Sequence, residues 1–140
     1  MKLVVQPAEL GKIREHGARD YPHECCGVLL GNQDGDNKVI TEARPLSNAR
    51  EDSKHNRFVI SPQDMLESEK YARQKGLDLL GFYHSHPDHP ARPSEYDREH
   101  AWPWWSYVIV SVQKGRPADL TSWVLAEDRS RFEEESVQEA

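Results

Sequence analysis

Short apolar segments of strand length recur along the chain, separated by polar turns and by longer stretches with helical spacing. Residues 106–112, rich in Val, have the composition of a central strand. Residues 25–30 and 38–46 flank the polar turn 32–37 and are expected to pair as an antiparallel hairpin. The expected strands are 2–5, 25–30, 38–46, 57–60, 79–83, 106–112 and 120–126, with a polar loop over 47–56.

Two amphipathic stretches lie between these strands and predict helices. Pro7 opens the first helix, which ends before Tyr21. Ser61 is the expected N-cap of the second helix, which stops near Gly76 and covers one face of the sheet. The apolar positions of these helices are Leu10, Ile13 and Ala18 in the first and Met65, Leu66, Tyr71 and Ala72 in the second.

This order of elements predicts an α/β fold with a single mixed β-sheet flanked by helices. The 140 residues suffice for one core but not for two, so we expect residues 1–140 to form one domain. The sequence after residue 126 is strongly acidic. Within residues 127–140 we expect a frayed tail, with at most a short edge strand around Phe132 and Val137.

Composition and charge narrow the function classes. A net charge of −6 with no block of Lys and Arg argues against nucleic acid as a partner, because phosphate binding needs a basic surface. No apolar run reaches membrane-spanning length, and residues 1–10 lack the features of a signal peptide, which predicts a cytoplasmic protein. The adjacent Cys25 and Cys26 are expected to be reduced, with Cys26 packed in the core.

Three tryptophans fall within four positions, at Trp102, Trp104 and Trp105. Such a cluster can serve as a recognition surface. Bulky aromatic side chains are more often buried, so core packing or a homodimer contact is the favoured interpretation.

The end of the strand over 79–83 carries the most informative chemistry. His84 and His86 follow this apolar segment directly. In an extended chain, residues i and i+2 point to the same face, so both imidazoles can converge on one point while Ser85 faces away. Backbone geometry thereby positions two metal ligands. His89 lies outside this pair and is interpreted as a surface residue.

A third ligand is expected from a helix that begins at Ser94. If Ser94 is the N-cap, Asp97 lies about one turn into this helix, near Ser94 on the same face. The two residues could also form no more than a variant capping box, with Asp in place of the usual Glu or Gln. Two imidazoles and one carboxylate, with a position left for water, are typical of catalytic zinc. The same set occurs in non-haem iron oxygenases, so the identity of the metal stays open.

The spacing of these residues is that of a known signature. The sequences H-S-H-P at 84–87 and P-S-E-Y-D at 93–97 resemble, without departure, the motif of the JAMM metalloproteases, also called MPN-plus domains. The family also has a catalytic glutamate before a Cys-Gly and a short apolar strand, and Glu24 in the sequence H-E-C-C-G at 23–27 matches it. The resemblance extends over residues 8–126.

The resemblance implies a curved mixed sheet with helices on its faces, similar to the architecture of the cytidine deaminases, although the deaminase motif is absent. It implies one Zn²⁺ held by His84, His86 and Asp97, which lowers the pKa of a bound water towards about 7. Glu24 is then the general base, and Ser94 hydrogen-bonds the water or the oxyanion of the tetrahedral intermediate. The implied reaction is metal-assisted amide hydrolysis.

Family members cut peptide or isopeptide bonds after the Gly-Gly tail of ubiquitin or of a ubiquitin-like protein. This short chain most resembles the prokaryotic Mec-type enzymes, which release cysteine or a similar amine from small sulfur-carrier proteins. The extended tail is expected to lie along an exposed strand edge. A deubiquitinase-like isopeptidase acting on lysine-linked conjugates is the second hypothesis, and a non-catalytic scaffold like the MPN-minus domains is the third.

Overall fold

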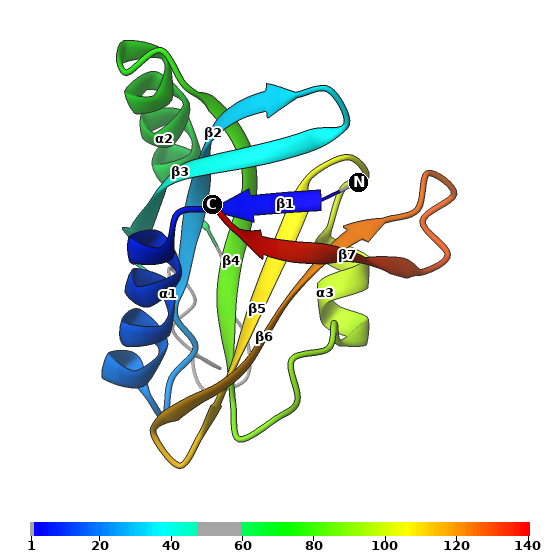
Figure 1. The fold of residues 1–140 in the computed structure, drawn as a ribbon. Helices are drawn as coiled ribbons and strands as arrows, with labels where there is room; N and C mark the ends of the chain where they lie inside the picture. The colour runs from blue at the N-terminus through cyan, green and yellow to red at the C-terminus, as the bar shows by residue number, and fades with distance from the viewer. Residues whose placement is uncertain (1, 48–59) are drawn as a thin grey trace.

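The computed structural model describes residues 2–47 and 60–140 (Figure 1). The elements in these ranges follow one another as β1 (Lys2–Val5), α1 (Pro7–Asp20), β2 (Cys26–Asp34), β3 (Asn37–Leu46), α2 (Pro62–Gln74), β4 (Asp78–Pro87), α3 (Glu95–His100), β5 (Ser106–Gln113), β6 (Arg116–Leu125) and β7 (Phe132–Glu139). The strands form one sheet in the order β1-β3-β2-β4-β5-β6-β7, which closes on itself. Because β4 pairs antiparallel with β2 and parallel with β5, the sheet is mixed, as predicted.

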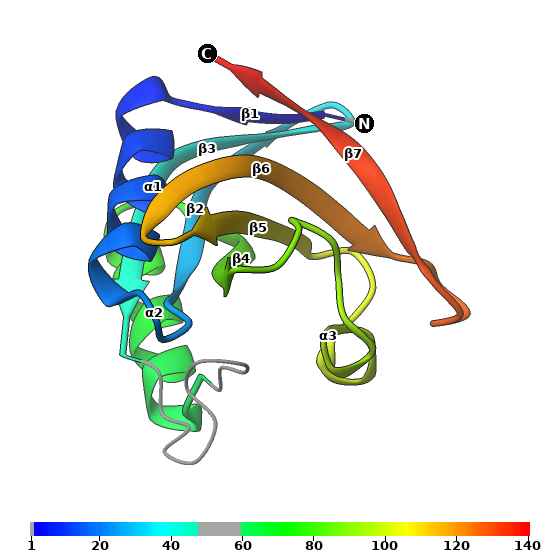
Figure 2. The ribbon, with the colours of Figure 1, turned by 90° about the horizontal axis from the view of Figure 1, so that it is seen from below.

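Two apolar cores are built from the side chains of this sheet. Leu10 and Ile13 of α1 join the first, together with apolar side chains from β1 to β5. Ala72 of α2 joins the second, where Phe82 of β4 is also buried. Seen from below, α2 and α3 stand on either side of the end of β4 (Figure 2). The end of β4 therefore lies between two helices.

Several predicted boundaries differ from the structure in detail. The hairpin turn is shorter than 32–37, because β2 continues to Asp34 and pairs there with Asn37. Leu66 is exposed rather than packed, since the buried positions of α2, Ser68 and Ala72, lie on another side of the helix. Of the loop expected over 47–56 and the strand expected over 57–60, residues 48–59 lie outside the described ranges.

The strand expected around Phe132 and Val137 is present as β7, but the predictions of fraying and of an edge position are wrong for residues 132–139. β7 pairs antiparallel with β6 and parallel with β1, and it closes the sheet. Glu135 points into the interior, where its carboxylate accepts hydrogen bonds of 2.6 Å from Ser106 Oγ and 2.7 Å from Ser122 Oγ. A glutamate in an acidic stretch looks solvent-exposed by composition alone, but its inward hydrogen bonds help to hold β7 in place.

Of the two interpretations favoured for the tryptophans, core packing is wrong for two of the three, and a homodimer contact stays a prediction. Trp102 is 65% exposed and Trp104 is also exposed, while Trp105 packs beside Phe82 with ring centroids 5.5 Å apart. Trp104 adopts a positive φ of 81° in the turn before β5. A tight turn can direct only part of its side chains to the core, so the cluster divides between core and surface.

Gly81 of β4 pairs with Ser106 of β5, and the space beside its Cα admits no side chain. A Cβ added there would lie 2.1 Å from the carbonyl oxygen of Ser106, whereas one added at Gly11 in α1 would meet nothing within 4 Å. We expect Gly81→Ala to lower the free energy of unfolding by about 1–3 kcal/mol, because backbone must move to admit the methyl group. The matched variant Gly11→Ala should raise it by about 0.5–1 kcal/mol, because alanine favours the helix. Urea denaturation measures both, and an unchanged Gly81→Ala protein would contradict the packing argument.

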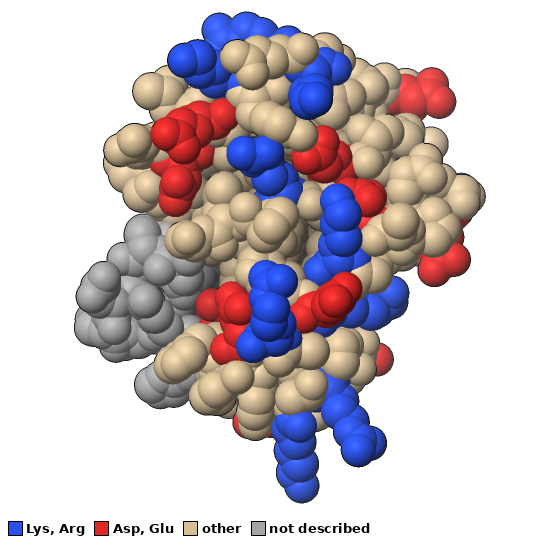
Figure 3. Space-filling model, turned by 90° about the vertical axis from the view of Figure 1, so that its left-hand side faces the viewer, with Lys and Arg blue, Asp and Glu red and all other residues tan. Residues whose placement is uncertain are grey.

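Charge is distributed unevenly over the side of the molecule that lies at the left of Figure 1. Figure 3 shows basic side chains gathered at the top of this face and intermixed with acidic ones below. The last turns of α2 and the residue that follows carry exposed Lys70, Arg73 and Lys75.

Within the described residues, no helix combines the length and apolar character needed to span a membrane.

Candidate metal centre

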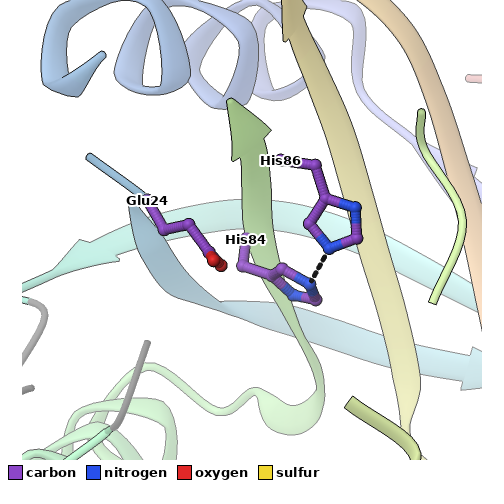
Figure 4. A group of neighbouring side chains, drawn as sticks. All are labelled: Glu24, His84 and His86. Atoms are coloured by element: carbon purple, nitrogen blue, oxygen red, sulfur yellow. Dashed lines mark hydrogen bonds between the residues drawn. The ribbon is translucent and has the colours of Figure 1, made fainter. Parts of the chain in front are cut away.

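His84 and His86 lie at the end of β4 and are largely buried, at 1% and 8% exposure. Their Nε2 atoms are 3.1 Å apart. Figure 4 shows both imidazoles on one side of the strand with these nitrogens facing each other. The side chain of Ser85 instead accepts a hydrogen bond of 2.9 Å from the backbone N–H of Cys25. This arrangement agrees with the convergence expected from i, i+2 spacing.

Asp97 lies in the first turn of α3, and Ser94 is the N-cap. The Ser94 N–H donates to Asp97 Oδ2 over 2.8 Å and the Asp97 N–H donates to Ser94 Oγ over 3.0 Å, which makes a capping box. The same Oδ2 lies 3.3 Å from Nε2 of His84 and 3.2 Å from Nε2 of His86. The capping box and the convergence on the imidazoles therefore coexist, and the cap holds the carboxylate against the two rings.

The three atoms form a nearly equilateral triangle with edges of 3.1, 3.2 and 3.3 Å. Tetrahedral zinc binds nitrogen and oxygen at about 2.0–2.1 Å, which puts neighbouring ligand atoms about 3.3–3.4 Å apart. His84, His86 and Asp97 thus fit Zn²⁺ in both atom type and spacing. Three protein ligands would leave a fourth corner for water or substrate.

The orientation of His86 is set by the loop that follows β4. Its Nδ1 lies 2.9 Å from the carbonyl oxygen of Pro90. A carbonyl oxygen can only accept, so the ring carries its proton on Nδ1 and presents the Nε2 lone pair to the triangle. This contact could not be predicted from the sequence, because the acceptor is the backbone carbonyl of Pro90 and not a side chain.

Burial and neighbouring charge set the protonation states of two triangle residues. Burial lowers the pKa of His84, which favours the neutral imidazole that a metal ligand must be. Burial acts against ionisation of Asp97, but His84 and His86 outweigh it and hold the pKa of that carboxyl well below its usual range. A neutral imidazole and an ionised carboxylate are the states that bind a divalent cation.

Glu24 stands just before β2 and is buried, at 4% exposure. A carboxylate oxygen lies within 4.8 Å of ring nitrogens of both His84 and His86, and Figure 4 shows the carboxylate turned towards His84. The hydrogen bond between Cys25 and Ser85 ties the segment that carries Glu24 to β4. A carboxylate in this place can take a proton from a water beside the triangle. The spacing of Glu24, His84 and His86 would also allow these three residues to bind a metal ion together.

The thiol next to Glu24 is not a competing nucleophile. Cys25 is buried, and burial raises the pKa of Cys25 to about 12. The thiol is therefore protonated at neutral pH, and a thiol is a far weaker nucleophile than a thiolate.

Two clefts open beside the triangle, and they differ in the kinds of residue that line them. The polar cleft, of about 370 Å³, is lined by Glu24, His86, Pro87, His89, Pro90, Arg92 and Ser94. The apolar cleft, of about 290 Å³, is lined by Ile60, Met65, Phe82, Pro93, Tyr96, His100, Trp102, Tyr107, Ile109 and Phe132 together with His84 and Asp97. Ser94 uses a lone pair for the helix cap, so its hydroxyl hydrogen remains for a group in the polar cleft. The sequence analysis assigned no role to Arg92, although this residue lies between the H-S-H-P and P-S-E-Y-D sequences of the motif.

Comparisons with known proteins agree with this geometry. The family described as prokaryotic homologs of the JAB domain matches residues 7–126. A Haloferax volcanii protein named desampylase is 39% identical over 103 residues, which cover 73% of this chain and 72% of that protein. A Thermus thermophilus protein named "probable TtuB-protein conjugate cleaving protease" is 33% identical over 101 residues, which cover 71% of this chain and 64% of that protein. A solution structure from Desulfitobacterium hafniense has a TM-score of 0.86 and 31% identity, covering 99% of this chain and 92% of that one.

Proposed function

The chain belongs to the prokaryotic homologues of the JAB domain and is a JAMM-type hydrolase, and from this premise we propose that it is a zinc-dependent peptidase acting on a ubiquitin-like sulfur-carrier protein. The proposed bond is the amide between the carrier's C-terminal Gly-Gly and cysteine or a similar amine. The observation that carries the proposal is the triangle of His84, His86 and Asp97 with the carboxylate of Glu24 beside it.

The polar side chains of the site have defined roles in the proposed reaction. His84, His86 and Asp97 would hold the ion. When bound, the ion would act as a Lewis acid and make hydroxide available near neutral pH. Glu24 would accept the proton of the attacking water and deliver it to the departing amine. Ser94 would donate its hydroxyl hydrogen to the oxyanion of the tetrahedral intermediate, a contribution of about 2.7–4 kcal/mol.

The two clefts support a substrate that crosses the triangle as an extended chain. The apolar cleft suits apolar side chains of a carrier tail, and the polar cleft suits the departing amine. Glycines at the cleaved bond would let the backbone approach the triangle closely. β4 cannot supply the strand edge expected for the tail, because β2 and β5 pair with it on both sides. The name of the Thermus thermophilus relative supports a protein-linked substrate.

Intact-mass spectrometry tests the proposal directly. The metal-loaded protein is incubated with a small ubiquitin-like carrier that bears one cysteine after its Gly-Gly end. We expect the carrier to lose the mass of one cysteine residue, and we expect no loss when a chelator has removed the metal. A zinc-loaded protein that leaves every such carrier intact would contradict the proposed substrate.

An isopeptidase that cleaves lysine-linked ubiquitin-like conjugates is the second candidate. The name of the Thermus thermophilus relative, which refers to protein conjugates, favours it. Cleavage of a carrier joined to a lysine side chain, with no release of a terminal cysteine, would support it over the first. A protein that binds no metal would instead support a scaffold role.

A further inference from the structure

We infer that Arg92 binds the carboxylate of the departing residue, and thereby selects a carrier that ends in one free amino acid over a carrier joined to a lysine side chain. This inference rests on the proposed function, because it concerns the leaving-group side of the same site. It identifies a residue that determines specificity.

The polar cleft is the leaving-group side because of where Glu24 lies. Glu24 lines the polar cleft, whereas His84 and Asp97 line the apolar one. A carboxylate that protonates the departing amine must be within reach of that amine. The departing residue therefore occupies the polar cleft. A volume of about 370 Å³ is near the lower end of the range of about 300–1,000 Å³ for small-molecule sites, which suits a single residue.

Among the described residues that line the polar cleft, Arg92 is the one Lys or Arg. Its side chain is exposed, and no acidic side chain in the described parts of the chain forms an ion pair with it. A guanidinium forms two parallel hydrogen bonds with a carboxylate, which lysine cannot imitate. The cleft therefore offers an unpaired, fork-shaped cation to an anionic group beside Glu24.

Hydrogen bonds hold the backbone that leads into Arg92. Its N–H donates to the carbonyl oxygen of Pro90 over 2.8 Å, and Pro90 is itself bound to His86. The preceding Ala91 is buried, and its carbonyl oxygen accepts a hydrogen bond of 2.7 Å from Thr121 Oγ1. These contacts tie the backbone at Arg92 to the loop that also orients His86, so the side chain starts from a defined place beside the triangle.

The chemistry of the departing group decides which substrate Arg92 favours. In a terminal amino acid, the amine and the carboxylate are attached to the same carbon, so Glu24 and Arg92 can serve one residue together. In a lysine-linked conjugate, the departing amine ends a chain of four methylene groups and no carboxylate follows it. Such a substrate would leave the guanidinium without an anion.

The test compares two carriers that end in Gly-Gly-Cys, one with a free C-terminal carboxylate and one with a C-terminal amide. For the metal-loaded wild-type protein we expect kcat/KM to favour the free acid by about 10- to 100-fold, as for a hydrogen-bonded charged group. In Arg92→Gln the ratio should fall to near one, and in Arg92→Lys it should be intermediate. Arg73→Gln, an exposed arginine of α2, is the matched control and should keep the wild-type ratio.

The ratio of the two rates does not depend on how much of a variant is active, so partial misfolding cannot imitate the expected result. A wild-type protein that cleaves both carriers equally, or an Arg92→Gln protein that keeps the preference, would overturn the role of Arg92 and leave the proposed function intact. A wild-type protein that cleaves neither carrier would overturn the proposed function and this inference with it.

Discussion

Glutamine in place of Glu24 is expected to lower the rate of hydrolysis by about 10²- to 10⁴-fold while the protein keeps its metal. Glutamine has the shape of glutamate and fits the same position, where Glu24 is buried. It cannot accept a proton from water, so only the proton transfer is lost. The measurement is kcat on the cysteine-terminated carrier, together with zinc per chain by elemental analysis.

Two other results for Glu24→Gln would change the role assigned to Glu24. Turnover at the wild-type rate would show that another group is the base. Loss of zinc would show that Glu24 completes the ligand set with His84 and His86, which the spacing also permits. Glu99→Gln, an exposed glutamate of α3, is the control and should match the wild type in both measurements.

Removal of the Asp97 carboxylate in Asp97→Ala is expected to weaken zinc binding at least 100-fold and to abolish hydrolysis with it. Loss of a group that only orients a ligand already costs about 10- to 100-fold in metal affinity, and here a ligand itself would be lost. The two imidazoles would remain, but without the negative charge that lies 3.2–3.3 Å from them. Competition with a chelator of known affinity measures the change.

Asp97 also caps α3, so its replacement removes a helix contact as well as a ligand. Ser94→Ala separates the two effects, because it removes the hydrogen bond from the Asp97 N–H and leaves the carboxylate in place. Loss of an N-cap costs about 1 kcal/mol of stability, and we expect Ser94→Ala to retain zinc. Full zinc binding by Asp97→Ala would remove Asp97 from the ligand set.

The sequence was most informative where function depends on neighbouring residues. The alternation of a strand was enough to put His84 and His86 on one face, and helix capping was enough to put Asp97 beside Ser94. Both rules act over two to four residues and hold in almost any protein. The distance between the strand and the helix could not be derived in that way. The link between them came from the ligand set expected for a catalytic metal and from the family resemblance.

Contacts between distant parts of the chain were harder to foresee. Glu24 is 60 positions from His84, and nothing in the local pattern brings them together. The contact of Pro90 with His86 uses a backbone carbonyl, which carries no sequence signature. The buried Glu135 was misjudged because charge alone predicts exposure, and an inward glutamate is recognised only once its two serine donors are in place.

The pairing of β1 with β7 has a consequence for how the protein folds. Leu3 pairs with Val137, a separation of 137 − 3 = 134 positions. A contact of this kind closes a loop of nearly the whole chain, and high contact order makes folding slow, since the entropy of loop closure must be lost before the contact is gained. Until closure, β1 and β7 present unpaired backbone groups that can pair with another chain. The native sheet hides these edges, so the risk of aggregation is concentrated in the interval before the two ends of the chain meet.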